Sequence, residues 1–246
     1  ETVLQRPQPL LPLTVDADKR YDLVILAYQV WFLSPSLPLT SFLASPEAAR
    51  LLKDTPVVTL IGCRNMWLMA QEKVKVQLAE LGARLVDNIA LTDACGTAAS
   101  FLATPLWLFT GRQKAYSWVP RAGIDPAEIA AASRFGEAMA QRLTHDGLPI
   151  EQPMLKGLGA VKIDEKLIAS EKVGNRSFQL WSRLLAALGP QQSRRRGVGL
   201  VIYIVFLLCL IVTVVPLSAL LKKLLAPLFK ARIQREKAYF AGPSGE

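Results

Sequence analysis

YDLVILAYQVWFLSPSLPL, at residues 21–39, decides the fold of this chain, because a short apolar run gives way there to an aromatic, proline-containing loop. Residues 23–27 are apolar without alternation, as expected of a parallel strand covered on both faces. In open α/β sheets, ligands bind beyond the carboxyl ends of such strands. The loop at residues 28–33 is therefore the first candidate for a binding site.

Two further strands follow with the spacing of an α/β fold. Residues 39–52 are rich in alanine and leucine and predict a helix, and the apolar run at 57–61 predicts a second buried strand. A polar loop at 62–65 precedes a predicted helix at 66–81, whose apolar residues recur every three or four positions. Residues 84–91 predict a third strand. This alternation indicates an α/β fold with a doubly wound parallel sheet.

The order of these motifs resembles a known family. The pattern D-L-V-I-L-x-x-x-V-W-F-x-S-P-S-x-P at 22–38, followed by P-V-V-T-L-I-G-C-R-N-M-W at 56–67, resembles flavodoxin-like FMN proteins related to NAD(P)H:quinone reductases. More narrowly, it resembles bacterial dialkylresorcinol-condensing flavoproteins (DarA type), together with the stretches at 91–93, 104–112 and 120–125. The resemblance covers roughly the first 143 residues.

The resemblance implies a flavodoxin-like sheet whose first strand carries a Ser/Thr/Gly-rich loop, which holds the FMN phosphate at a helix N-terminus. This chain shows no such loop, and its residues 1–6 resemble the second strand of the family. We therefore expect the sequence to be incomplete at its N-terminus, without the first strand and the phosphate loop. The alternative is a protein that never had the loop and binds flavin poorly.

FMN is the cofactor that the resemblance implies, with NAD(P)H as a candidate electron donor. Trp31 or Phe32 would stack on the isoalloxazine, the loop at 62–65 would supply backbone amides, and Arg64 would stabilise the anionic reduced flavin. Core packing is the alternative for the two aromatic side chains. No catalytic residue and no metal ligand is predicted. The predicted cofactor-binding residues are Tyr28, Gln29, Val30, Trp31, Phe32, Leu33, Gly62, Cys63, Arg64 and Asn65.

The segment 97–118 is apolar and aromatic, but it is interrupted by Pro105 and is too short to span a bilayer. It suits an insertion over the site or a segment on the membrane surface, and an ordinary loop at the sheet edge is the alternative. We predict that Trp107, Phe109 and Arg112 contact substrate or lipid.

Cysteine and histidine usage excludes two classes of site. Three cysteines without CxxC spacing indicate neither a disulfide framework nor a zinc site. The single histidine, His145, excludes His-dependent triads and clusters of histidine ligands. Cys63 is better explained as a half-buried structural thiol than as a reactive one.

A closing helix is predicted at 125–143. Asp125 suits the N-cap position and Pro126 the first helical position. Small residues give this helix a face able to press against the sheet. They are Ile129, Ala132, Ser133, Gly136 and Ala140.

The second half of the chain contains the strongest apolar signal. Residues 197–221 are uncharged and mostly valine, isoleucine and leucine, and about 20 such residues span a bilayer core. The predicted organisation begins with a flavodoxin-like domain at 1–145 and a linker at 146–176, which contains at most a short helix near 164–170. An interfacial amphipathic helix at 177–189 follows. The chain ends with a transmembrane helix at 197–221 and a basic tail at 222–246.

The net charge of +9 gathers on both flanks of the apolar run. The positive-inside rule therefore leaves two topologies open, a single span and a helix pair bent at Pro216. Anionic lipid, rather than nucleic acid, is the predicted partner of this charge. We place the protein in a bacterial inner membrane, with its globular domain in the cytoplasm, where FMN and reduced nicotinamide are found.

These features predict a membrane-anchored, FMN-dependent oxidoreductase. Its substrate would be a lipid-tailed cyclic intermediate of the resorcinol or cyclohexanedione type, and a ketosynthase and an acyl carrier protein are candidate partners that the resemblance implies. One alternative is an NAD(P)H:quinone reductase, because a quinone also explains a membrane anchor. Another is a flavodoxin-like scaffold without a cofactor.

Overall fold

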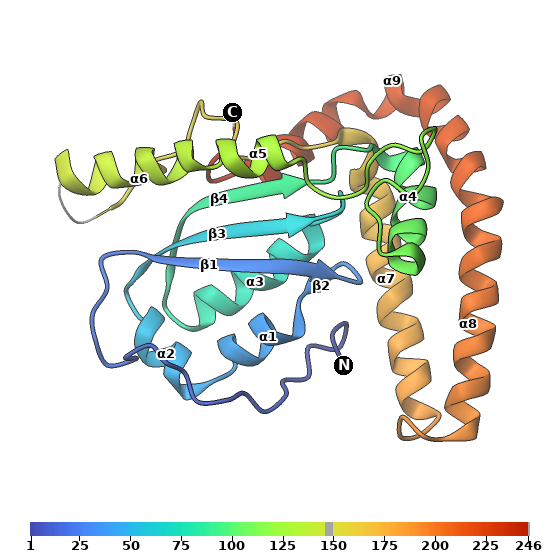
Figure 1. Ribbon diagram of the computed structural model, residues 1–246, viewed down its shortest axis with the longest axis horizontal. Coiled ribbons are helices and arrows are strands. Elements are labelled where there is room, and N and C mark those ends of the chain that lie inside the picture. The colour runs from blue at the N-terminus through green and yellow to red at the C-terminus, as the bar shows by residue number, and fades with distance from the viewer. Residues whose placement is uncertain (146–149, 246) are drawn as a thin grey trace.

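The structure, a computed structural model, describes residues 1–145 and 150–245. An open sheet of four strands lies at its centre, in the order β2-β1-β3-β4 (Figure 1). β1 pairs with β3 and β3 with β4 in parallel, whereas β2 is a short antiparallel partner of β1. The predicted α/β class and its parallel sheet are confirmed. The strands are β1 (Val24–Trp31), β2 (Ser34–Pro35), β3 (Pro56–Cys63) and β4 (Arg84–Thr92).

β3 and the middle of β4 are covered on both faces, and in β4 the consecutive residues 86–89 are all buried. In β3, Val57, Val58 and Ile61 are all fully buried. β1 instead alternates, with Leu26 inside and Ile25 half exposed. The prediction that this apolar run is covered on both faces is therefore wrong, because the strand lies near the edge of the sheet.

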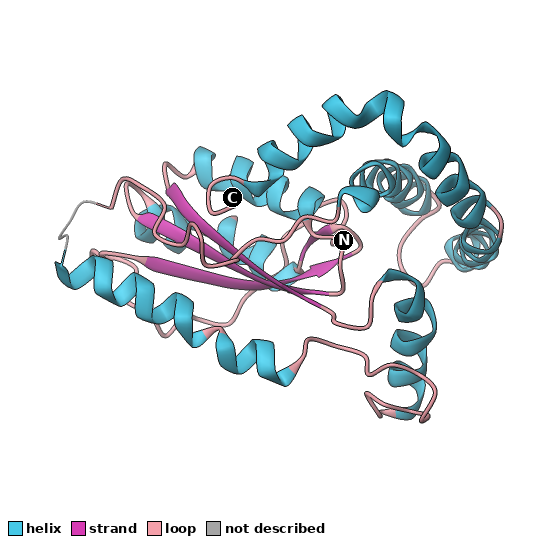
Figure 2. Ribbon diagram, turned by 90° about the horizontal axis from the view of Figure 1, so that it is seen from above, coloured by secondary structure: helices cyan, strands magenta, loops and turns pink. Residues whose placement is uncertain are grey.

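Helices pack on both faces of the sheet (Figures 1 and 2). One face carries a core that includes Leu52, Ile61 and Val74, and the other carries a core that includes Val58 and Phe135. The helices of the first face are α1 (Leu37–Leu43), α2 (Pro46–Leu52) and α3 (Leu68–Glu80), and those of the second are α5 (Pro126–Ala131) and α6 (Ser133–His145).

Two helices predicted as continuous are each divided. The helix predicted at 39–52 breaks at Ser45, whose hydroxyl accepts a hydrogen bond from the Ala48 amide (3.2 Å) and caps α2. The closing helix begins as predicted, with the Asp125 carboxylate accepting from the Ala127 amide (2.9 Å). It breaks at Ala132.

The closing helix packs through a different face from the one predicted. Phe135 and Met139 are buried against the sheet, while Ile129 is half exposed. Small residues permit a close approach, but larger apolar side chains bury more surface, and here the larger ones face the core.

Much of the predicted linker at 146–176 is folded, although its first residues lie outside the described ones. The backbone amides of Met154 and Leu155 donate to the buried Asp87 carboxylate of β4 (2.7 and 3.3 Å). α7 (Glu165–Ala187) begins at Asp164, whose carboxylate accepts from the Lys166 amide (3.0 Å). The predicted helices near 164–170 and at 177–189 are thus one helix.

The apolar run forms α8 (Arg194–Val212), which lies antiparallel to α7 at the outer edge of the molecule (Figure 1). Among the described residues, α8 alone is long and apolar enough to cross a membrane. The predicted span at 197–221 is not one helix, because the chain bends at Thr213 before α9 (Val214–Ala241).

The predicted basic tail at 222–246 returns to the sheet. Phe240 and Ala241, at the end of α9, are buried, and Phe240 belongs to the core below β1 and β3. The Ser244 hydroxyl accepts from the Asn88 amide (2.5 Å) and donates to Asp87 (2.7 Å). At the other terminus, residues 1–6 form a turn instead of the expected strand.

Candidate functional site

The two predicted loops meet at one edge of the sheet. In the parallel register, Gln29 of β1 lies opposite Gly62 of β3, and Cys63 lies opposite Thr92 of β4. The chain therefore leaves all three strands at the same edge, which we call the carboxyl edge (Figure 1). In open α/β sheets this is the position of ligand sites.

The end of β1 and the turn after it present two aromatic side chains, because residues 28–31 of the predicted loop continue the strand. Trp31 is 39% exposed and donates through its indole N–H to the Gln29 side chain (3.1 Å), while Phe32 is 63% exposed. Phe32 and Leu33 have left-handed backbones (φ 53° and 56°), which turn the chain sharply. Of the residues predicted here, Gln29, Trp31 and Phe32 are exposed and Val30 is half-buried.

Tyr28 and Leu33, predicted as cofactor-binding, point inward and are buried. The Tyr28 hydroxyl donates to the Gln71 side chain of α3 (2.6 Å), and Gln71 in turn donates to Thr59 (2.9 Å). Thr59 donates to Asn88 (3.0 Å), so a chain of polar side chains crosses the sheet. These contacts satisfy buried polar groups and tie α3 to three strands.

The loop predicted at 62–65 is shorter in the structure, because Gly62 and Cys63 end β3 and the loop begins at Arg64 and Asn65. All four residues are half-buried. The Arg64 guanidinium lies over the Phe101 ring of α4 (Thr97–Thr110), 4.7 Å from its centroid. Burial lowers the pKa of Arg64, and Cys95 and Asp93 oppose that shift. Arg64 is thus placed at the carboxyl edge and held by an aromatic face.

The helix α4 and the turn after it provide the three residues predicted to contact substrate or lipid. Trp107 packs on Gly123, where an added Cβ would lie 3.4 Å from the indole. Phe109 is 84% exposed, and Arg112 follows the helix on an exposed turn. Arg64 and Phe101 connect this helix to the β3 loop.

α7 covers part of the carboxyl edge. The Phe178 ring meets Phe32 edge-to-face, with ring centroids 5.9 Å apart. A Cβ on Gly174 would lie 3.1 Å from Leu33, so glycine permits the helix to approach the β1 loop closely. One ring predicted to stack on flavin therefore contacts a helix of the chain itself.

Glu171 on α7 has the most strongly shifted pKa of the carboxyl groups near this edge. It lies within the predicted linker, where no sequence pattern marks it as a functional residue. Its side chain is 1% exposed, and one oxygen accepts from the Met69 amide at the start of α3 (2.7 Å). The other oxygen, Oε2, has no hydrogen-bond partner among the described residues. Burial raises the pKa of Glu171 to about 7, against the effect of the Met69 and Leu68 amides.

Two more titratable groups lie close by. Burial raises the pKa of the Cys63 thiol to about 12, and the Glu171 charge adds to this, so the thiol stays protonated at neutral pH. The Lys73 ammonium donates to the Ser34 hydroxyl (2.7 Å), and burial lowers the pKa of Lys73 to about 8. The helical positions of Gln71 and Lys73 were visible in the sequence, but their partners are too distant in the chain to infer.

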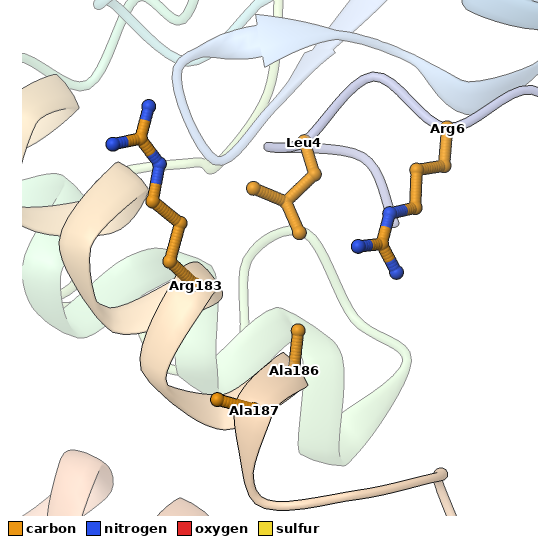
Figure 3. Close-up of a pocket in the computed structure, with 5 residues that line it drawn as sticks. All are labelled: Leu4, Arg6, Arg183, Ala186 and Ala187. Carbon is orange, nitrogen blue, oxygen red and sulfur yellow. The ribbon is translucent and has the colours of Figure 1, made fainter.

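A separate open cavity of about 510 Å³ lies between the N-terminal segment and α7. Figure 3 shows Arg183 of α7 and Arg6 of the N-terminal segment on either side of Leu4. Ala186 and Ala187 complete its lining, which includes none of the predicted cofactor-binding residues. In the part of the chain that the structure describes, no group of three or more His, Cys, Asp or Glu side chains could hold a metal ion.

Comparison with known proteins assigns no family. No family model, no curated protein and no solved structure matches this chain.

Proposed function

We propose that this chain is a membrane-anchored oxidoreductase that holds FMN at the carboxyl edge, between the loops after β1 and β3. The observation that carries the proposal is that exposed Trp31 and Phe32, at the end of β1, lie beside the half-buried residues 62–64 at the end of the parallel strand β3. A flat ring could stack on Trp31, and a guanidinium near the ring would stabilise an anionic reduced state. When bound, FMN supplies the redox chemistry.

The apolar helix α8 supports a substrate with a lipid tail. An enzyme on a bilayer meets such a molecule at a high local concentration, and the exposed Leu108 and Phe109 of α4 extend apolar surface beyond the carboxyl edge. A long-chain cyclic dione or resorcinol fits this arrangement, and so does a quinone reduced by NAD(P)H.

A scaffold without a cofactor is the second candidate, and α7 is the observation that favours it. Phe178 contacts Phe32, and Glu171 accepts a hydrogen bond at the start of α3, so groups of the chain itself cover part of the edge. In this function the edge would position a partner enzyme at the membrane.

Flavin binding separates the two functions. Binding to the purified protein should quench the fluorescence of added FMN. Trp31→Ala should weaken this binding by roughly fivefold, because a lost aromatic contact is worth about 1 kcal/mol. Trp118→Ala is the matched control, since Trp118 is 70% exposed and lies outside both loops. Absence of any FMN binding by the folded protein would favour the scaffold.

Flavin-dependent turnover then distinguishes the substrates. Rapid oxidation of NADH or NADPH with a long-chain quinone would assign the reductase. Turnover of a long-chain cyclohexanedione with no quinone activity would assign the biosynthetic enzyme.

A further inference from the structure

The outer surface of α8 is an apolar stripe that nothing in the described chain covers. The stripe follows positions three and four apart, and every member is more than half exposed. The opposite side of α8 contacts α7, where Trp181 lies 5.2 Å from both Tyr203 and Phe206 between ring centroids. The stripe consists of Val198, Val201, Ile202, Val205, Leu208 and Val212.

Charge around the stripe identifies a lipid bilayer as its occupant. Residues 194–235 include no aspartate or glutamate, whereas Arg194, Arg195 and Arg196 begin α8 and further cations follow in α9. Apolar residues flanked by cations suit acyl chains beside anionic headgroups. A patch of this composition on a protein in water would otherwise mark an aggregation site.

The end of α9 is held on the elements that precede α8. Glu236 pairs with Lys172 of α7 (3.0 Å), and Lys237 pairs with Glu165 of α7 (2.8 Å). The Tyr239 hydroxyl donates to Glu72 of α3 (2.6 Å). Together with the buried Phe240 and Ser244, these contacts place residues 236–244 on the same body as the sheet.

A single crossing by α8 is incompatible with these contacts, because it would put α3 and the start of α7 on one side of the membrane and residues 236–244 on the other. A second crossing after α8 cannot return the chain. Residues 213–235, the only ones available for it, carry Lys222, Lys223, Lys230, Arg232 and Arg235, which are expensive in a bilayer core.

We infer that α7 and α8 form a monotopic anchor. The apolar stripe enters one leaflet of an anionic bilayer, and the sheet, Arg194–Arg196 and the end of α9 all stay on the same side. The exposed Leu180 and Leu184 of α7 extend the apolar surface of the anchor. This inference rests on the membrane anchoring proposed above, and not on flavin binding.

Labelling from either side of a membrane tests this arrangement. In the full chain with Cys63, Cys95 and Cys209 replaced by serine, single cysteines are introduced by Ala49→Cys on α2, Arg195→Cys at the start of α8 and Arg235→Cys on α9, all at exposed positions. Right-side-out and inverted vesicles from bacterial cells are treated with a membrane-impermeant maleimide. Detergent-treated vesicles show that each thiol can react.

All three cysteines should react from the same side, and the protein should remain on membranes after an alkaline carbonate wash. Val205→Cys, in the stripe, should react from neither side until detergent is added. If the Arg235→Cys thiol reacts from the opposite side of the membrane to the Ala49→Cys thiol, α8 is a single span and the inference is wrong. An Arg195→Cys thiol on the opposite side would establish a hairpin that crosses the bilayer, and a soluble protein would exclude the anchor.

A second measurement does not depend on vesicle orientation. In the same serine background, Glu72→Cys and Tyr239→Cys should be joined by a short bismaleimide in membranes, because their side chains are in contact. If this pair does not cross-link in folded, membrane-bound protein, residues 236–244 do not pack on α3 and the inference is wrong. FMN binding is measured separately, so a protein that does not bind FMN can still give both membrane results.

Discussion

Glu171 combines two opposed effects at one residue. A carboxylate at the start of a helix is favoured by the helix dipole and by the amides it accepts from, here Met69 and Leu68. Its burial beside Cys63 disfavours the charged form more strongly and raises the pKa of Glu171 to about 7. The group therefore changes charge in the physiological range.

The pH dependence of stability should report this group. Between pH 4.5 and 7 the folded state keeps a proton that the unfolded state has released, so the free energy of unfolding falls as pH rises. The fall should approach about 3 kcal/mol, at about 1.4 kcal/mol for each pKa unit. Urea unfolding at several pH values should show this slope in the wild type and not in Glu171→Gln.

Glu151→Gln, at an exposed position, is the control for this experiment and should keep the wild-type slope. An unchanged slope in Glu171→Gln would mean that the carboxyl group is solvated in solution.

Strand alternation explains which predicted residues reach the surface at the carboxyl edge. Side chains of a strand point to opposite faces in turn. With Leu26 in the core, Tyr28 must also point inward, whereas Gln29 and Trp31 point outward. The sequence does not show this division, because residues 23–27 are all apolar and an alternation of buried and exposed positions leaves no trace in such a run.

At the scale of elements, local signals located most strands and helix starts. Pro56 opens β3 and Asp125 caps α5 because these effects act within one turn of chain. The break between α1 and α2 has a local signal too, because Ser45 and Pro46 suit the N-cap and first positions of a new helix. The path of α7 over the carboxyl edge could not be predicted, since the Glu171 contact with Met69 joins residues 102 apart.

Gly199 controls the packing of α8 on α7. A Cβ there would lie 2.5 Å from Leu188 and 3.2 Å from Leu185. Gly199→Ile should therefore separate the two helices at a cost of roughly 1–3 kcal/mol, as overpacking does elsewhere. Trypsin cleavage at Arg194–Arg196, in mild detergent, should become several times faster.

Gly197→Ile controls for the change in helix propensity, because no atom lies within 4 Å of a Cβ at that position. Equal cleavage of both variants would show that the two helices do not pack closely through Gly199.

For the whole molecule, the division into a domain and a detachable anchor is incomplete. Deleting the residues after Gln192 removes the apolar helix, but it also removes Phe240 from the core and Ser244 from Asp87. We expect the shortened protein to be less stable by at least 3 kcal/mol, the usual effect of losing one buried aromatic side chain. Urea unfolding followed by circular dichroism measures this difference.

Phe240→Ala with Ser244→Ala in the full chain should reproduce much of that loss while leaving the protein on membranes. A shortened protein with the wild-type urea midpoint would contradict the packing of the tail. The sequence could not anticipate this result, because the basic composition of residues 222–246 is that of a solvated tail and the contacts to β4 join residues 156 and 157 apart.

The hydrogen bonds between Ser244 and β4 also govern when the protein can finish folding. β4 is synthesised early, yet its Asn88 amide and Asp87 carboxylate acquire their final partner only when residue 244 has left the ribosome. Contacts between residues so far apart in the sequence slow folding. Until they form, the unpaired edge of a strand can pair with other chains. Nascent chains that stop short of residue 244 should therefore be held by chaperones.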